Sequence, residues 1–173
     1  MSPVTKVAGS RSRNQGRDNN PSCMKIPRET PIGLLFHSRE FLMAAELVLN
    51  RTSTVSLPAY FLLGRSVELS LKAYLLACGL PMKQLASRKF GHNLISLFAE
   101  ANRHGLSAKI EIEPMEAGVL DLLSYDYASK RFEYRLTDGT YYLPRIEVTE
   151  AIARKLVGRL DDFCSGASRA QDA

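Results

Sequence analysis

One segment restricts the fold of this chain more than any other: residues 57–78 are apolar on nearly all sides at helical spacing. Ser56 is a good N-cap, Pro58 fits a first helical turn, and Gly79 followed by Pro81 marks a helix end. A helix that is apolar all round must be covered by other elements. The segment therefore predicts a buried central helix with further helices packed around it.

The main polar feature of this central helix consists of Arg65, Glu68 and Lys72. At 3.6 residues per turn they share a sector of about 60°, so Glu68 can pair with Lys72 at i, i+4 and with Arg65 at i, i−3. Charges on an apolar helix are costly unless they are paired. Two interpretations stay open: a self-satisfied polar stripe on a solvent or partner face, or a cluster that faces a ligand or a phosphate.

Further segments of the chain also have helical period. Apolar residues recur at i, i+3, i+4 and i+7 within residues 31–50, 93–104, 114–128 and 147–163. The sequence therefore predicts an all-α fold, a bundle of about five helices.

The period changes from helical to alternating just before the last of these helices. Phe132 and Tyr134 alternate with charged residues, and Asp138-Gly139 is a strong signal for a type I′ turn. The pattern predicts a small β-hairpin over residues 131–143.

The positive charge of the chain is concentrated at its start. Residues 1–28 hold six basic residues and one acidic residue, which accounts for the whole net charge of +5, and the rest holds 17 of each sign. This start is rich in Ser, Asn, Arg, Gly and Pro, so it buries too little apolar surface to offset its ordering entropy. We expect a disordered basic tail over 1–28, one helical domain over 29–164 and a frayed C-terminus over 165–173.

The composition also bears on location. No apolar run reaches the length of a membrane span, and no apolar region follows the basic N-terminus. The three cysteines (Cys23, Cys78 and Cys164) are odd in number and far apart, which favours reduced thiols. We expect a cytoplasmic protein that does not contact a membrane.

Sequence motifs of common enzymes are absent. His37, His92 and His104 match no metal-ligand spacing, and the chain has no HExxH, no GxSxG and no glycine loop that would cradle a phosphate. We therefore expect no metal, no cofactor and no catalytic residue.

Aromatic and basic residues are concentrated between Tyr125 and Arg145, where five of the seven tyrosines lie. Aromatic rings beside cations can stack nucleobases and hold phosphates, which makes Arg131, Tyr134 and Arg135 candidate ligand-binding residues. Two other interpretations stay open: the rings cover the end of the helical core, or they form a dimer interface.

Three sequences carry a family resemblance. Glu68-Leu-Ser-Leu-Lys-Ala-Tyr-Leu lies on the central helix, and Gly91-His92-Asn93-Leu94 follows at the start of the next one. They are similar to the ELxLKAxL and GHxL sequences of the HEPN superfamily. Lys130-Arg-Phe-Glu-Tyr-Arg resembles the RY stretch that often follows them. The resemblance covers residues 57–135.

The resemblance implies an up-and-down helical bundle, usually a homodimer. It also implies association with nucleotides, RNA or nucleotidyltransferase partners, often in defence or toxin–antitoxin settings. Active HEPN ribonucleases carry Arg and His separated by four to six residues. Here three residues separate Arg88 from His92, and Arg103 abuts His104, so that spacing is absent. We therefore expect a non-catalytic module that binds a nucleotide, RNA or a partner protein.

The resemblance also concerns His92, which matches the GHxL position. It is expected to cap the helix that follows and to touch Glu68, and it joins Arg65, Glu68 and Lys72 as a candidate ligand-binding residue. Two alternatives stay open. One is a metal-independent HEPN-type ribonuclease with a degenerate motif, in which His92 acts with Arg88 or Arg65. The other is a purely structural or interaction protein.

Overall fold

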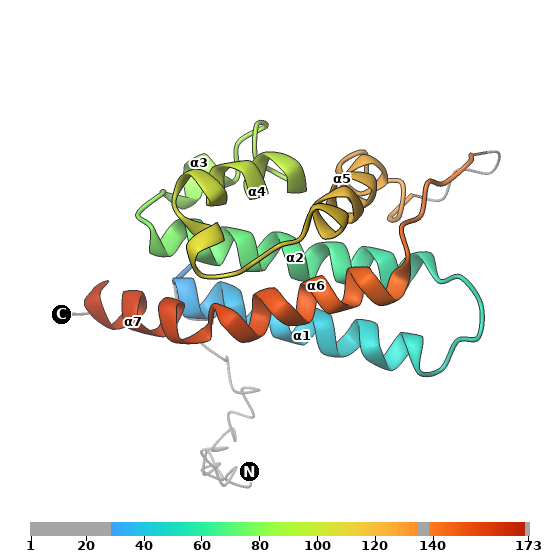
Figure 1. Cartoon of the computed structure of the whole chain (residues 1–173), viewed down its shortest axis with the longest axis horizontal. Helices are drawn as coiled ribbons and strands as arrows, with labels where there is room; N and C mark the ends of the chain where they lie inside the picture. Colours follow the sequence, from blue (N-terminus) through green and yellow to red (C-terminus); the bar gives the residue numbers. More distant parts are fainter. Residues whose placement is uncertain (1–28, 135–138, 172–173) are drawn as a thin grey trace, which may run out of the picture.

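The computed structural model describes residues 29–134 and 139–171, and every regular element in this part of the chain is a helix (Figure 1). This confirms the all-α prediction. The elements are α1 (Pro31–Leu49), α2 (Leu57–Ala77), α3 (Met82–Leu85), α4 (Leu94–Arg103), the 3₁₀ helix η1 (Leu106–Ala108), α5 (Pro114–Ala128), α6 (Ile146–Arg159) and α7 (Asp161–Gln171).

The second helix lies in the middle of the molecule (Figure 1). α1 and α6 pack along one side of α2, and α4 and α5 lie along the other side. α7 continues the line of α6 and contacts both α1 and α2. Between Leu63 and Leu75 every residue of α2 except Arg65 is buried, so α2 is the central helix that its apolar surface predicts.

The helix ends follow local capping chemistry. Thr30, Ser56 and Asn93 each accept a hydrogen bond from a backbone N–H in the first turn of α1, α2 and α4, at 3.1, 3.3 and 2.9 Å. Gly79 and Gly105 follow α2 and α4 with φ of +94° and +85°, a left-handed conformation that glycine adopts without strain. These caps fix where the central elements begin and end.

The predicted β-hairpin over residues 131–143 is wrong, because its described parts, 131–134 and 139–143, contain no strand. The backbone N–H groups of Arg131 and Tyr134 donate to carbonyls at the end of α5 and in the turn after it. Asp126, in α5, accepts a hydrogen bond of 3.0 Å from the backbone N–H of Tyr142. Backbone donors that a strand ladder would use are therefore bound by α5 and by the turn after it.

The alternating pattern that predicts a hairpin has another cause. The rings of Phe132 and Tyr141 stack at 6.3 Å, and Phe132 stacks on Tyr60 of α2 at 5.9 Å. These rings cover one end of the helical core, which was one of the three interpretations of the aromatic segment. Leu136 and Asp138 of the predicted hairpin lie outside the described residues.

The end of the chain differs from its prediction as well. The single helix expected over 147–163 is two helices, because α6 ends at Arg159 and α7 begins at Asp161. α7 extends to Gln171, past the point where the pattern predicts fraying. Asp161 forms an ion pair of 2.7 Å with Arg39, and the hydroxyl of Ser168 accepts a hydrogen bond of 3.1 Å from the backbone N–H of Ile32. These contacts with α1 hold α7 on the bundle.

Two further findings concern the whole described chain. Among residues 29–134 and 139–171, none of the helices has the length and apolar character needed to cross a membrane. The sequence also makes predictions for residues 1–28 and for Arg135. These residues lie outside the part of the chain that the structure describes.

Candidate functional site

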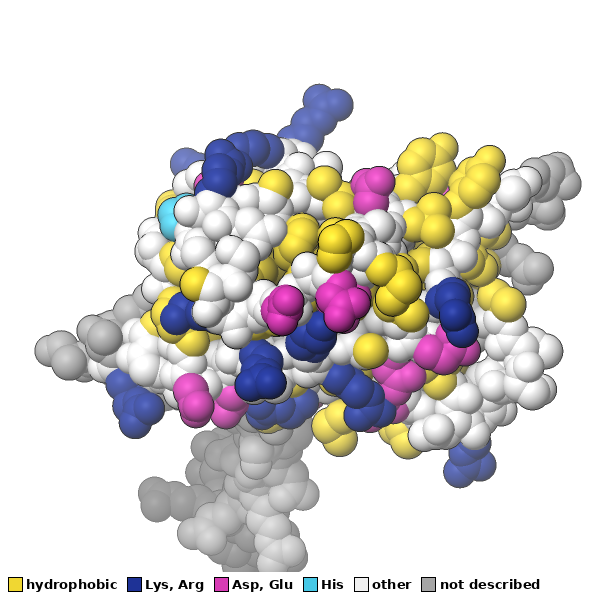
Figure 2. Space-filling view, in the orientation of Figure 1, with side chains coloured by type: hydrophobic (Ala, Val, Ile, Leu, Met, Phe, Trp, Pro, Cys, Tyr) yellow, Lys and Arg dark blue, Asp and Glu magenta, His cyan; other side chains and the backbone are white. Residues whose placement is uncertain are grey.

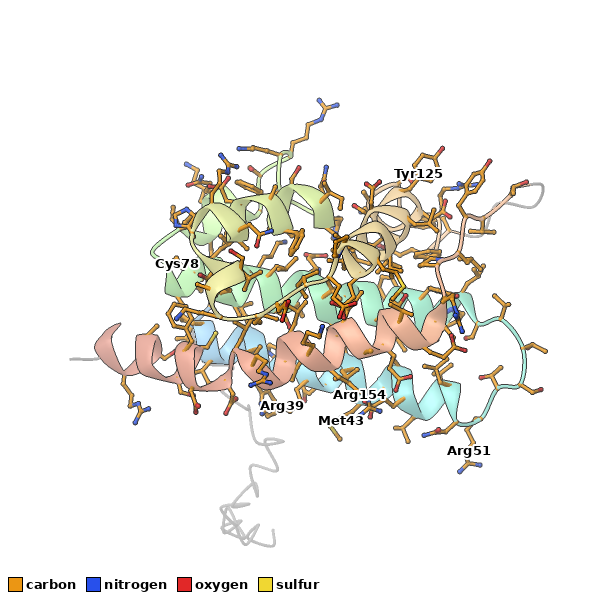
Figure 3. All side chains as sticks on the ribbon, viewed as in Figure 1. Arg39, Met43, Arg51, Cys78, Tyr125 and Arg154 are labelled. Carbon is orange, nitrogen blue, oxygen red and sulfur yellow. The ribbon has the colours of Figure 1, made fainter. Side chains whose placement is uncertain are left out.

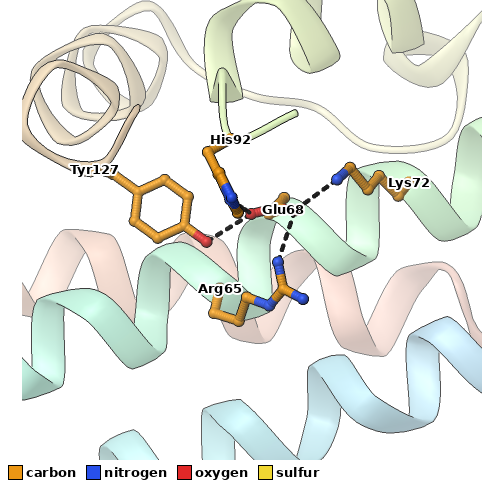
Figure 4. A network of polar contacts seen from close by, with 5 residues as sticks. All are labelled: Arg65, Glu68, Lys72, His92 and Tyr127. Carbon is orange, nitrogen blue, oxygen red and sulfur yellow. Dashed lines mark hydrogen bonds and ion pairs between the residues drawn. The ribbon is translucent and has the colours of Figure 1, made fainter. Parts of the chain in front are cut away.

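The polar residues of α2 meet at a single carboxylate (Figure 4). Helical spacing places Arg65, Glu68 and Lys72 on the same side of α2, as their positions in the sequence predict. His92 comes from the turn before α4, and Tyr127 comes from the last turn of α5. The cluster therefore joins three parts of the bundle at the middle of its central helix.

Each carboxylate oxygen of Glu68 accepts two hydrogen bonds. Oε1 accepts hydrogen bonds from Lys72 Nζ at 2.6 Å and from Arg65 Nη1 at 2.8 Å. Oε2 accepts from the Tyr127 hydroxyl at 2.6 Å and lies 2.9 Å from His92 Nδ1, which donates to the carboxylate. Glu68 itself is 0% exposed. Four donors satisfy the capacity of an ionised carboxylate, so burial leaves none of its lone pairs without a partner.

The surroundings of Glu68 decide its ionisation. Burial opposes the charged form, but Lys72 and Arg65 together outweigh this effect and hold the pKa of Glu68 below its ordinary value. Burial and the neighbouring Glu68 raise the pKa of Tyr127, so its hydroxyl stays protonated and donates. Two permanent cations share one carboxylate, and the cluster therefore carries an excess of positive charge.

The cluster reaches the surface at two side chains. The side chain of Arg65 is 31% exposed and that of His92 is 37% exposed. Nε2 of His92 makes no hydrogen bond within the described residues. Since no buried side-chain nitrogen or oxygen in that part of the chain lacks a partner, Nε2 is in contact with solvent. A guanidinium has five N–H donors, so Arg65 also keeps donors beyond the one that Glu68 accepts.

Tyr127 and Gly64 belong to the site and were not among the candidate residues. Gly64 lies on α2 directly against the ring of Tyr127, and a Cβ at Gly64 would stand 2.6 Å from a ring carbon. This close approach lets the Tyr127 hydroxyl reach Glu68. The glycine inside an otherwise strong helical pattern was the one signal in the sequence for such a contact.

The structure separates the second candidate group from the first. Arg131 is bound to the buried carboxylate of Asp126, and its Nη2 donates to the carbonyl of Thr140 at 2.7 Å. Through these contacts Arg131 holds the chain around Thr140 against α5. Tyr134 is 70% exposed and has no ring contact among the described residues, while Arg135 lies outside them.

Two further tyrosines of the aromatic segment are exposed. Tyr125 on α5 and Tyr142 lie edge to face at 6.0 Å, and Leu122 lines the same hollow as the two rings. Figure 2 shows hydrophobic side chains gathered over this part of the molecule, and Figure 3 shows Tyr125 projecting outward from α5. Among the described residues, no group of His, Cys, Asp and Glu has the arrangement of a metal site.

The comparisons with known proteins returned no relative. No protein-family model, no curated protein and no solved structure matches this chain.

Proposed function

We propose that this chain is a non-catalytic HEPN-like module that binds the phosphate groups of a nucleotide or of RNA at Arg65 and His92. The observation that carries the proposal is that one buried carboxylate holds both side chains in place, while Arg65 keeps N–H donors at the surface and His92 presents Nε2 there. A guanidinium fixed in this way favours an anion, because its ordering cost is met before the ligand arrives. Nε2 of a histidine donates to a phosphate when the ring carries both protons.

The charge of the cluster supports a phosphate rather than a cation. Lys72 and Arg65 outnumber Glu68, and Glu68 has no exposed surface. An approaching ligand therefore meets the exposed edges of Arg65 and His92 and does not meet the carboxylate. The homodimer, a nucleotidyltransferase-like partner, and a defence or toxin–antitoxin setting in the cytoplasm are parts of the same proposal, and they rest on the sequence resemblance.

A second candidate function has a specific observation in its favour. A carboxylate that binds Nδ1 of a histidine fixes its orientation and leaves Nε2 able to accept a proton, which is the arrangement of many general bases. Glu68 and His92 have this geometry. With Arg65 nearby, the pair supports a metal-independent ribonuclease. The missing Arg–His spacing of active HEPN ribonucleases favours the non-catalytic module.

One experiment separates the two functions. Labelled single-stranded RNA and nucleotides are titrated into the full chain at several salt concentrations, and the same RNA is inspected for cleavage. We expect binding that weakens with salt and no cleavage. His92→Asn keeps a donor toward Glu68 and removes Nε2, so it should weaken binding by about tenfold.

Matched controls make the result specific. His37→Asn alters a partly exposed histidine on α1 that pairs with Glu40, far from the Glu68 cluster in the sequence, and it should leave binding unchanged. Cleavage that His92→Asn abolishes in a folded protein would establish the ribonuclease instead. Equal affinity of His92→Asn, His37→Asn and the unaltered protein would show that the ligand does not bind at this cluster.

A further inference from the structure

An open groove lies between the first turn of α4 and the outer face of α5. It has a volume of about 570 Å³, and its lining includes Ile95, Ser96, Asp121, Ser124 and Tyr125. That volume lies within the range of small-molecule sites. None of these residues belongs to the Glu68 cluster, so the groove is a separate candidate site.

The hydroxyl of Ser124 distinguishes this groove from an ordinary surface hollow. Ser124 is only 6% exposed, yet its hydroxyl makes no hydrogen bond within the described residues. Every buried side-chain oxygen in that part of the chain has a partner, so the oxygen of Ser124 must open to the groove that the residue lines. A nearly buried hydroxyl aimed at an open groove is a donor available to a ligand.

The first turn of α4 supplies further donors at the other wall. The side chain of Asn93 caps the N–H of Ser96 at 2.9 Å, but the N–H group of Ile95, which lines the groove, has no acceptor within the helix. The N-terminal end of a ten-residue helix also carries partial positive charge. Together with Ser124, this wall offers the donor arrangement that binds a phosphate.

A fixed aromatic ring forms the neighbouring wall. Tyr125 is 62% exposed, and Tyr142 packs edge to face against it with an interplanar angle of 82°. The backbone of Tyr142 is itself held by Asp126. A second hollow of about 410 Å³ shares Tyr125 and Asp121 with the groove, so the groove continues along the ring. An exposed ring that is already oriented favours stacking of a planar group.

We infer that this groove binds a nucleoside monophosphate. The phosphate accepts hydrogen bonds from the first turn of α4 and from the Ser124 hydroxyl, and the base stacks on Tyr125. The Asp121 carboxylate accepts hydrogen bonds from the N–H groups of the base or from the sugar hydroxyls. The site depends on residues other than Arg65 and His92, so a test of this inference is independent of a test of the proposed function.

The test is calorimetric titration of the full chain with adenosine and guanosine monophosphates. Adenosine lacks the phosphate and ribose 5-phosphate lacks the base, so each should bind at least tenfold more weakly than the monophosphates. Ser124→Ala and Tyr125→Leu should each weaken monophosphate binding about tenfold, through loss of one hydrogen bond to an anion and of one stacking contact. Tyr134→Leu removes an exposed tyrosine outside the groove and is the matched control.

Several outcomes overturn the inference. One is that neither monophosphate binds at millimolar concentration, and another is that adenosine or ribose 5-phosphate binds as well as the monophosphates do. A third is that Arg65→Ala abolishes binding while Ser124→Ala and Tyr125→Leu do not, which would place the nucleotide at the Glu68 cluster. Loss of RNA binding in His92→Asn with unchanged monophosphate binding supports both sites separately.

Discussion

A carboxylate without exposed surface is unfavourable by several kcal/mol unless charged partners and hydrogen bonds surround it. Glu68 meets this condition with two cations, a tyrosine and a histidine. Its pairing with Lys72 and Arg65 follows from helical spacing, and its contact with His92 was expected from the GHxL position. Tyr127 was not predicted, because it lies 59 residues later and only the packing of α5 on α2 brings it to Glu68.

The hydroxyl of Tyr127 provides a test at the scale of one atom. Tyr127→Phe keeps the ring against Gly64 and removes one donor to a buried carboxylate. We expect a loss of about 1.5–3 kcal/mol in the free energy of unfolding, measured by urea denaturation. Tyr134→Phe, at an exposed site, should change it by less than ~0.5 kcal/mol. Equal stability of Tyr127→Phe and the unaltered protein would contradict the hydrogen bond.

The ionisation of Glu68 provides a second test. Because Lys72 and Arg65 outweigh burial, the pKa of Glu68 lies below its ordinary value of 4.5. The stabilisation from this group is present above pH 4.5 and is lost as the pH falls through the pKa of the folded state. Carbon-detected NMR titration of the Glu68 carboxyl should therefore show a midpoint below 4.5, and Lys72→Met should raise it. A midpoint at or above 4.5 in the unaltered protein would be inconsistent with this charge balance.

At the scale of elements, local sequence patterns predict most helix ends. They fail near residue 132, where packed rings and hydrogen bonds to α5 take the place of strand pairing. Ser56 and Gly79 mark the two ends of α2, and sequence patterns identify both correctly. The period-two pattern near residue 132 arises from rings that stack on the end of α2, and periodicity alone does not distinguish such packing from a strand. The ends of α6 and α7 depend on contacts with α1, which lies more than 100 residues earlier.

The approach of α5 to α2 can be tested through the two glycines of these helices. Gly64→Ala places a methyl group against the Tyr127 ring, and overpacking costs about 1–3 kcal/mol. Gly118→Ala on α5 meets open space and should stabilise the protein by up to ~1 kcal/mol, because alanine favours helix. Thermal unfolding of both variants gives the comparison. A stabilising Gly64→Ala would refute the tight contact.

At the scale of the whole molecule, the charges of residues 29–173 balance and the excess lies in residues 1–28. A phosphate site in such a protein depends on local placement of cations and gains little from overall charge. The sequence predicts the helical class and the polar stripe, since both follow from period and spacing. It does not predict the α4–α5 groove, which forms only when Ser124 and Tyr125 meet the first turn of another helix.

The composition of residues 1–28 carries a prediction for the whole chain. Removal of this segment should leave the melting temperature within about one degree of the full chain, because it holds almost no apolar residues to bury. The measurement is calorimetry on the full and shortened proteins. A decrease of several degrees would show that the segment packs on the domain.

The central claim is that Glu68 anchors the cluster and the surface built on it. The free energy of unfolding of Glu68→Gln at neutral pH tests this claim most directly. The substitution keeps the shape and leaves Arg65 and Lys72 facing each other without their shared charge. We predict a loss of about 3–5 kcal/mol, as for a broken buried pair, whereas Glu40→Gln, at an exposed pair with His37, should cost less than ~1 kcal/mol. A cost below ~1 kcal/mol for Glu68→Gln as well would contradict the account.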